Sequence, residues 1–363
     1  MELALIGLPN SGKTTVFNAV TRAGAEVTAY ANPKAEPNVA VVEVEDERVE
    51  RLAEMYQPKK VVHATVTFVD FVGMGRSSGK SGRKADEGGE IFSASTMGLV
   101  KNADALAYVV RNFAGAGEGE PTPLRDVERL DEELLLADLI LVEKRLERID
   151  AAEKKGIATH EVKLQGKALR RIHAQLEAGG AARDLELTAD EEMAVRGFQL
   201  LTQKPALVIV NSSESQFGNN QELLDQIAAR HRVIEFAGAF EMELARLDDD
   251  EAKAFLEDIG IAGSARSRLT RLAHEVVGYI TFFTVGPKEV HAWNIRRGDT
   301  AVDAAGAVHT DLARGFIRAE RFTYDDLMTQ GSEKAVKEAG LFHLEGKVYI
   351  VQDGDILNIR FSV

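Results

Sequence analysis

The segment best suited to chemistry is a glycine-rich loop near the N-terminus, residues 7–14, which reads GLPNSGKT. It has the spacing G-x-x-x-x-G-K-[ST], in which backbone N–H groups surround phosphate oxygens. The lysine of this pattern reaches the β- and γ-phosphates, and the hydroxyl after it binds Mg²⁺. We therefore predict that Lys13 holds phosphate, that Thr14 binds Mg²⁺, and that a helix directs its positive end at the ligand.

A second candidate group stands at the end of a β-branched run, where Asp70 and Gly73 form the pattern D-x-x-G. A carboxylate at a strand end can hold Mg²⁺ through water, and a glycine lets a backbone N–H approach the γ-phosphate. The pattern is weak alone and becomes specific downstream of a phosphate loop. We predict Lys13, Asp70 and Gly73 as catalytic residues, with Thr14 and Asp70 as the metal ligands.

The third candidate segment is residues 211–214, which read NSSE after an apolar run. GTPases carry N-K-x-D there, and the Asp accepts hydrogen bonds from guanine. Here Ser212 replaces the Lys and Glu214 replaces the Asp, and its extra methylene spoils a bidentate fit to guanine. Adenine has less need of a carboxylate at that edge. The segment favours adenine, and a degenerate guanine site is the alternative.

The elements that position these residues follow from apolar patterning. Short apolar or β-branched runs predict strands at 3–6, 39–44, 61–69, 105–110 and 206–210. Helices are expected at 14–20 and 46–55. Strands that alternate with helices predict an α/β fold, a mostly parallel sheet with helices on both faces.

Two stretches interrupt or follow this pattern. Apolar residues with helical spacing occupy 135–149 and 162–176, separated by a turn at 154–156, and predict an antiparallel helical hairpin. A pair of ordinary surface helices is the alternative. After about residue 278, short strands at 279–284, 290–295 and 347–351 predict a compact α+β module. The predicted domains are a core at 1–133 and 206–278, an inserted hairpin at 134–205, and a tail at 279–363.

The chain resembles the YchF, or Obg-like ATPase, family of TRAFAC-class P-loop NTPases. The resemblance rests on the loop at 7–14, the segment at 211–214, and tail motifs that include KEV at 288–290, GFIRAE at 315–320 and VQDGD at 351–355. It implies a GTPase-like core, an inserted coiled coil and a C-terminal TGS-type module. It also implies ATP preference, association with ribosomes, K⁺ near Asn10, and adenine packing on Phe113.

These inferences define one set of expected nucleotide contacts: Asn10, Ser11, Gly12, Lys13, Thr14, Thr15, Phe113, Asn211, Ser212 and Glu214. Two departures from the family lie in the segments that sense the third phosphate. Lys34 stands where the family has Thr, and residues 76–94 replace a shorter glycine-rich switch. We predict an Mg²⁺-dependent ATPase, with a non-hydrolysing nucleotide sensor and a GTPase as the alternatives.

Composition limits the partners. The chain has 44 Lys and Arg against 58 Asp and Glu, a net charge of −14, and no cysteine. The charge argues against a histone-like binder, and cysteine chemistry and disulfides are excluded. Residues 144–171 nevertheless carry a net +5, so the hairpin can engage RNA phosphates or be an ordinary solvated face. The apolar run 134–142 is interrupted by Asp138, and it is too short to span a membrane. We expect a cytoplasmic monomer with no membrane or specific DNA partner.

Overall fold

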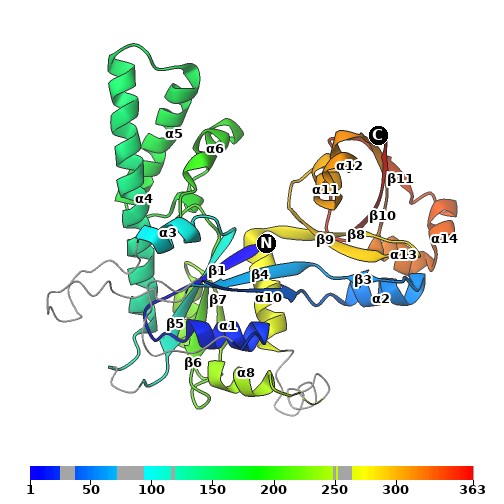
Figure 1. Cartoon of the computed structure of the whole chain (residues 1–363), viewed down its shortest axis with the longest axis horizontal. Helices are drawn as coiled ribbons and strands as arrows, with labels where there is room; N and C mark the ends of the chain where they lie inside the picture. Colours follow the sequence, from blue (N-terminus) through cyan, green and yellow to red (C-terminus); the bar gives the residue numbers. More distant parts are fainter. Residues whose placement is uncertain (25–36, 72–93, 116–118, 248–250, 252–263, 363) are drawn as a thin grey trace. The chain divides into compact units, whose positions relative to one another are not determined.

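The computed structural model of the 363-residue chain describes residues 1–24, 37–71, 94–115, 119–247, 251 and 264–362 (Figure 1). The chain divides into two compact units. One comprises Glu2–Ala40 and Phe68–Ala265, and the other comprises Met1, Val41–Thr67 and Arg266–Val363. The two units are described separately below.

The phosphate loop follows the first strand of a six-stranded sheet, whose strand order is β2-β4-β1-β5-β6-β7. Its strands are β1 (Glu2–Ile6), β2 (Asn38–Glu43), β4 (Thr65–Asp70), β5 (Ala105–Asn112), β6 (Ala206–Ser212) and β7 (Arg232–Phe236). Strand β5 runs parallel to β1 and to β6, and β6 runs parallel to β7. The predicted α/β fold is confirmed.

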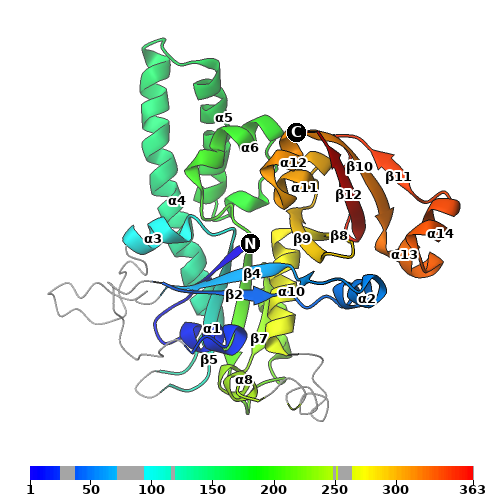
Figure 2. The same cartoon turned by 45° about the vertical axis from the view of Figure 1, so that its right-hand side comes forward.

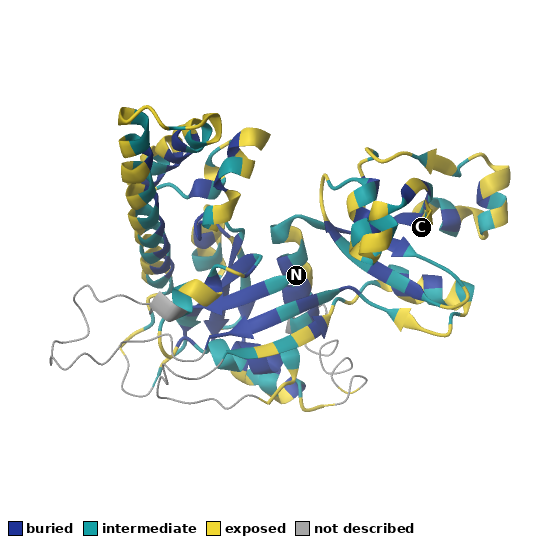
Figure 3. Ribbon diagram, turned by 45° about the horizontal axis from the view of Figure 1, so that its top comes forward, coloured by how far each residue is buried: buried dark blue, intermediate teal, exposed yellow. Residues whose placement is uncertain are grey.

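Both faces of the central strands are covered. Even-numbered side chains such as Ile6, Tyr108 and Val208 form one apolar cluster with α3 (Ala94–Val100), α4 (Pro123–Lys154) and α7 (Gln221–Ala228). Successive side chains of a strand point to opposite faces, so buried odd-numbered residues such as Leu5 line the other side. Helix α1 (Lys13–Thr21) contacts β1 and packs against α8 (Gly238–Leu244). Figure 3 shows the resulting band of buried strands.

The helical hairpin predicted between β5 and β6 is present. Helix α4 and α5 (His160–Glu177) run side by side in Figures 1 and 2 and bury residues such as Val142, Ile149 and Leu169. The predicted turn at 154–156 is present, and Gly156 takes a positive φ of 70° there. The chain returns through η1 (Ala182–Asp184), α6 (Ala189–Val195) and η2 (Arg196–Phe198).

A buried acid fixes the base of the hairpin. Asp138, fully buried in α4, accepts hydrogen bonds from Leu201 N (3.0 Å), Thr202 N (2.7 Å) and Thr202 Oγ1 (2.6 Å). These bonds satisfy two buried backbone N–H groups of the returning segment, which would otherwise be costly to bury. The acid that interrupts the apolar run is therefore a structural clamp.

The second unit contains a sheet of order β11-β10-β12-β8-β9-β3. Its strands are β3 (Val61–Val62), β8 (Tyr279–Thr284), β9 (Val290–Arg296), β10 (Phe316–Thr323), β11 (His343–Glu345) and β12 (Asp355–Phe361). The helices of this unit are α2 (Glu47–Tyr56), α10 (Ala265–Val277), α11 (Ala301–Val308), α12 (Thr310–Arg314), α13 (Tyr324–Gln330) and α14 (Glu333–Glu338). The C-terminal module is thus mixed α+β.

Two strand predictions are wrong. The run 61–69 is two strands, because β3 pairs with β9 whereas β4 joins the first sheet. Residues 347–351 contain only an isolated bridge from Ile350 to Thr300. That segment is held instead by Tyr349, whose hydroxyl donates to the buried Asp355 at 2.8 Å at the start of β12.

The two compact units also group residues differently from the sequence reading. Residues 41–67 and 266–278 cluster with the C-terminal module, whereas the sequence suggested that they belong to the core. The three-part division into core, hairpin and tail stays a prediction. In the described part of the chain, no helix is both long and apolar enough to cross a membrane.

Candidate nucleotide-binding site

The phosphate loop connects β1 to α1 with two residues in the left-handed backbone region. Asn10 has φ 59° and Gly12, the N-cap of α1, has φ 87°. Asn and Gly tolerate this region best, because other side chains clash with the backbone there. The turn closes with a hydrogen bond from Ser11 N to Leu8 O of 3.3 Å. The sequence therefore supplies a residue that suits each strained position of the loop.

Lys13 bridges the two ends of this loop. Its Nζ donates to Gly7 O at 3.0 Å and to Leu8 O at 2.9 Å. The residue keeps some exposed surface, but the ammonium group lies among protein atoms, and this burial lowers its pKa to about 8. Nearby Asp70 opposes the shift. The ammonium is thus held by neutral carbonyls, which a phosphate would replace with a stronger charged partner.

Thr14 and Asp70 meet beneath the loop. Thr14 Oγ1 donates to Asp70 Oδ2 at 2.7 Å, and Asn38 Nδ2 donates to the same oxygen at 3.3 Å. Asp70 is fully buried, and its Oδ1 has no hydrogen-bond partner among the described residues. A buried carboxylate oxygen without a partner is costly unless a cation or water satisfies it. The donor set fits Mg²⁺, which in nucleotide sites takes one or two protein oxygens together with phosphate oxygens.

Asn211 connects the end of β6 to the phosphate loop. Its Nδ2 donates to Ser11 O at 3.1 Å, and its Oδ1 accepts from Gly238 N at 3.0 Å. The approach is close, since a Cβ on either Gly12 or Gly238 would collide with the Asn211 amide. Asn211 therefore positions the loop, and both glycines are needed to let it do so.

Ser212 is held in a buried polar network. Its hydroxyl donates to Glu235 Oε1 at 2.6 Å and accepts from Asn112 Nδ2 at 3.0 Å. Asn220 also donates to Glu235. Glu214, by contrast, is exposed in the turn after β6. The network therefore uses the hydrogen bonds of the Ser212 hydroxyl. The side chain of Glu214, the acid of the 211–214 segment, faces solvent.

Phe113 follows β5 at the same edge of the sheet. Its ring carbon Cε1 lies 3.8 Å from the position that a Cβ on Gly12 would take, and the residue is half-buried. An aromatic face beside the phosphate loop is suited to stack on a nucleobase. The structure thus brings Phe113, Asn211 and the loop together, as the expected set of contacts requires.

Sequence reasoning missed the polar residues that support this set. Asn38 contacts Asp70, and Asn112, Asn220 and Glu235 surround Ser212. An acid inside the apolar run of β7 was the available signal for Glu235. Gly73, Lys34 and residues 76–93 lie outside the described residues, so the expectations attached to them stay predictions.

Comparison with known proteins identifies the family. Residues 2–145 match the family model described as a 50S ribosome-binding GTPase, and residues 279–362 match the YchF-GTPase C-terminal model, described as a protein of unknown function. The Ribosome-binding ATPase YchF of Pasteurella multocida is 38% identical over 370 residues, covering 100% of this chain and 99% of that protein. The chain belongs to the YchF family.

Other members show the same likeness over the whole chain. The Ribosome-binding ATPase YchF of Bacillus subtilis is 37% identical, with 100% of both chains covered. The Obg-like ATPase 1 of Oryza sativa is 35% identical over 100% of this chain and 92% of its own length. The solved structure of the Schizosaccharomyces pombe YchF GTPase has a TM-score of 0.81 at 28% identity, covering 99% of this chain and 97% of that one. The family resemblance is therefore confirmed.

Proposed function

We propose that this YchF-family chain is an Mg²⁺-dependent switch that binds and hydrolyses ATP and associates with the ribosome. The observation that carries the proposal is the pair of Thr14 Oγ1 and the buried Asp70 carboxylate, 2.7 Å apart beneath a phosphate loop. The printed names of curated relatives, which call them ribosome-binding ATPases, support it.

The residues of the loop would each do part of the reaction. Thr14 and Asp70 would hold Mg²⁺, which neutralises phosphate charge when bound. Lys13 and the backbone N–H groups at the start of α1 stabilise charge that develops on the β- and γ-phosphates as water attacks in line. Asn10 is the candidate for holding K⁺ beside the phosphates, in place of an arginine. Gly73 is proposed to contact the γ-phosphate through its backbone.

Phosphate release from the purified protein tests hydrolysis. We expect ATP-dependent release that needs Mg²⁺ and is faster in K⁺ than in Na⁺. Absence of release in both salts, with ATP still bound, would instead establish the second candidate, a nucleotide sensor that does not hydrolyse. The Lys34 that replaces the family's Thr favours that second candidate. A chain that neither binds nor hydrolyses ATP would refute both.

Adenine selectivity is the next part of the proposal. Phe113 lies beside Gly12, the Ser212 hydroxyl donates to Glu235, and the exposed Glu214 has one methylene more than the Asp that reads guanine in GTPases. We therefore expect ATP to bind more tightly than GTP in a competition titration, and Phe113→Ala to weaken ATP by roughly tenfold. Tighter binding of GTP would contradict adenine selectivity and favour the alternative of a guanine site at residues 211–214.

The tip of the hairpin is the proposed ribosome contact. Several of its cations are neutralised locally, since Arg170 pairs with Asp150 and Glu153, and Arg171 pairs with Glu191. Five exposed cations have no acidic partner among the described residues, and they lie toward the tip: Lys144, Arg148, Lys154, Lys155 and Lys163. Phosphates of ribosomal RNA are their natural partners, through counterion release.

Sedimentation with ribosomal subunits tests this surface. Reversal of the five tip charges to Glu should lower the bound fraction and weaken its dependence on salt. The matched control reverses Arg125 and Arg129, which are exposed on the same helix near the hairpin base. Equal binding by wild type and the tip variant would exclude the tip from the ribosome contact.

We also propose that core, hairpin and tail act as three functional parts, with the boundaries predicted from the sequence.

A further inference from the structure

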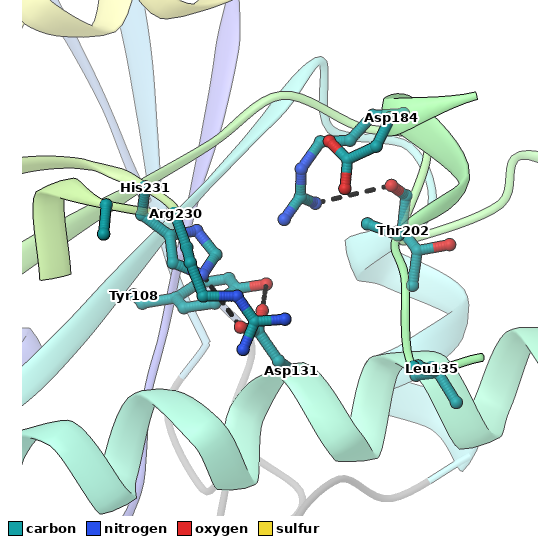
Figure 4. Close-up of a pocket in the computed structure, with 11 residues that line it drawn as sticks. Tyr108, Asp131, Leu135, Asp184, Thr202, Arg230 and His231 are labelled. Carbon is teal, nitrogen blue, oxygen red and sulfur yellow. Dashed lines mark hydrogen bonds and ion pairs between the residues drawn. The ribbon is translucent and has the colours of Figure 1, made fainter. Parts of the chain in front are cut away.

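A polar cavity lies at the base of the hairpin, within the first unit and separate from the phosphate loop. It has a volume of about 280 Å³ and is lined by residues of five segments, of which the turn before β6 contributes Thr202 (Figure 4). Tyr108 comes from β5, Asp131 from α4, Arg183 from η1, and Arg230 and His231 from the turn before β7. Tyr108 lies four residues before the end of β5 that faces the nucleotide site, about 13 Å along the strand.

Asp131, a half-buried acid of the cavity wall, is engaged by two neighbouring side chains. Asp131 Oδ1 accepts from the Tyr108 hydroxyl at 3.0 Å, and Asp131 Oδ2 lies 2.8 Å from His231 Nε2. Burial raises the pKa of Tyr108 well above its ordinary value, so this hydroxyl remains a donor. In Figure 4 these three side chains stand together on one side of the cavity, facing Thr202 and Asp184 across it. Asp131 is therefore held within the wall.

Among the described residues, the arginines of the cavity have polar neighbours but no carboxylate partner, and Arg183 lies against the Tyr108 hydroxyl. Arg183 Nη1 makes two long hydrogen bonds of 3.4 Å, to the carbonyl oxygens of Thr202 and Lys204. Arg230 is exposed at the mouth. Within the described part of the chain, neither guanidinium forms an ion pair with a carboxylate, although Asp184 is exposed on the rim. Two guanidinium groups at one concave site match the oxygens of a phosphate group, which arginine binds in bidentate fashion.

We propose that this cavity binds a small organic phosphate, with Arg183 and Arg230 as its cationic ligands. The volume admits a small molecule and is too small for a folded macromolecule. Because the walls come from α4 and η1 of the hairpin region and from β5 and the β7 approach of the core, the ligand bridges the hairpin to the sheet. Its binding therefore stabilises the hairpin base, and this inference is independent of the proposed nucleotide chemistry.

Calorimetric titration with glycerol 3-phosphate tests the proposal, with glycerol as the phosphate-free probe. The titration uses a Lys13→Ala background, because the phosphate loop is itself a phosphate site and must be weakened. We expect saturable binding of glycerol 3-phosphate and none of glycerol. Arg230→Gln should weaken binding by roughly tenfold, the loss typical of a charge-assisted hydrogen bond, and Arg183→Gln should weaken it similarly.

The controls separate binding from folding. Arg230 is exposed and is the deciding variant, since Arg183 also holds two carbonyl groups whose loss could unsettle the fold. Arg183→Lys keeps the positive charge, so its affinity for glycerol 3-phosphate should stay closer to that of the parent than the affinity of Arg183→Gln does. Arg129→Gln, on the exposed side of α4, should bind like its parent. No saturable binding, equal affinity in Arg230→Gln, or equal binding of glycerol would each overturn the proposal.

Discussion

The low pKa of Lys13 predicts how nucleotide affinity depends on pH. In the free protein, burial holds the pKa of the ammonium near 8. Bound phosphates favour the charged form and raise that pKa in the complex. Above about pH 8, Lys13 of the free protein has lost its proton and must regain it on binding. The association constant for ATP therefore falls as pH rises, up to the pKa of the complex.

The magnitude follows from this single proton. Between about pH 7.5 and pH 9.5, a group with a pKa of about 8 goes from mostly charged to almost fully neutral. The ATP association constant should fall about 25-fold over that range, which corresponds to about 2 kcal/mol. An unperturbed lysine, with its ordinary pKa of 10.5, would produce a fall of only about 10%. The two cases are readily distinguished.

Isothermal titration calorimetry supplies the assay. Binding measured in two buffers of different ionisation enthalpy gives the protons taken up, expected to rise from about 0.1 at pH 7 to about 0.9 at pH 9. Lys13→Met removes the titrating group and should bind ATP weakly, with no uptake. An affinity that stays constant from pH 8 to 9.5 in the wild type would refute the reasoning. So would equal proton uptake in Lys13→Met.

Three further predictions concern the buried polar groups. Asn211→Ala leaves Gly238 N–H without its acceptor, and should lower the free energy of unfolding by about 2 kcal/mol in chemical denaturation. Asp138→Ala removes the acceptor of two backbone N–H groups, Thr202 N among them, and should cost about 3 kcal/mol. Asp70→Asn should abolish the Mg²⁺-dependent part of ATP affinity, about tenfold or more, measured by titration with and without EDTA.

The Asp138 and Asp70 predictions each have a control variant. Glu132→Ala changes an exposed acid of the same helix as Asp138 and should shift the unfolding free energy by less than about 0.5 kcal/mol. Asn219→Ala removes an exposed amide of the loop between β6 and α7 and, as the control for Asp70→Asn, should leave ATP affinity unchanged. An Asp138→Ala protein with the unfolding free energy of wild type would contradict the role assigned to Asp138. An Asp70→Asn protein that still gains ATP affinity from Mg²⁺ would contradict the role assigned to Asp70.

Short-range patterns in the sequence were enough to predict several features of the fold and of the site. The loop at 7–14 carries its chemistry within eight residues, so it was recognisable before any neighbour was known. Helical spacing identified α4 and α5, because residues three and four apart share one face of a helix. The strands β1, β5 and β6 were recognisable because each is a short continuous run of apolar residues, which is a local pattern as well.

Contacts between residues far apart in the sequence became known from the fold alone. The sequence could not show that Asn38 donates a hydrogen bond to Asp70, or that Glu235 accepts one from Ser212. Nor could it show that the run 61–69 divides between two sheets. It also could not show that Asp138 binds backbone groups more than sixty positions away, or that Arg183 and Arg230 line one cavity. Such contacts depend on which strands become neighbours and in which register, and that is set by the packing of the whole chain.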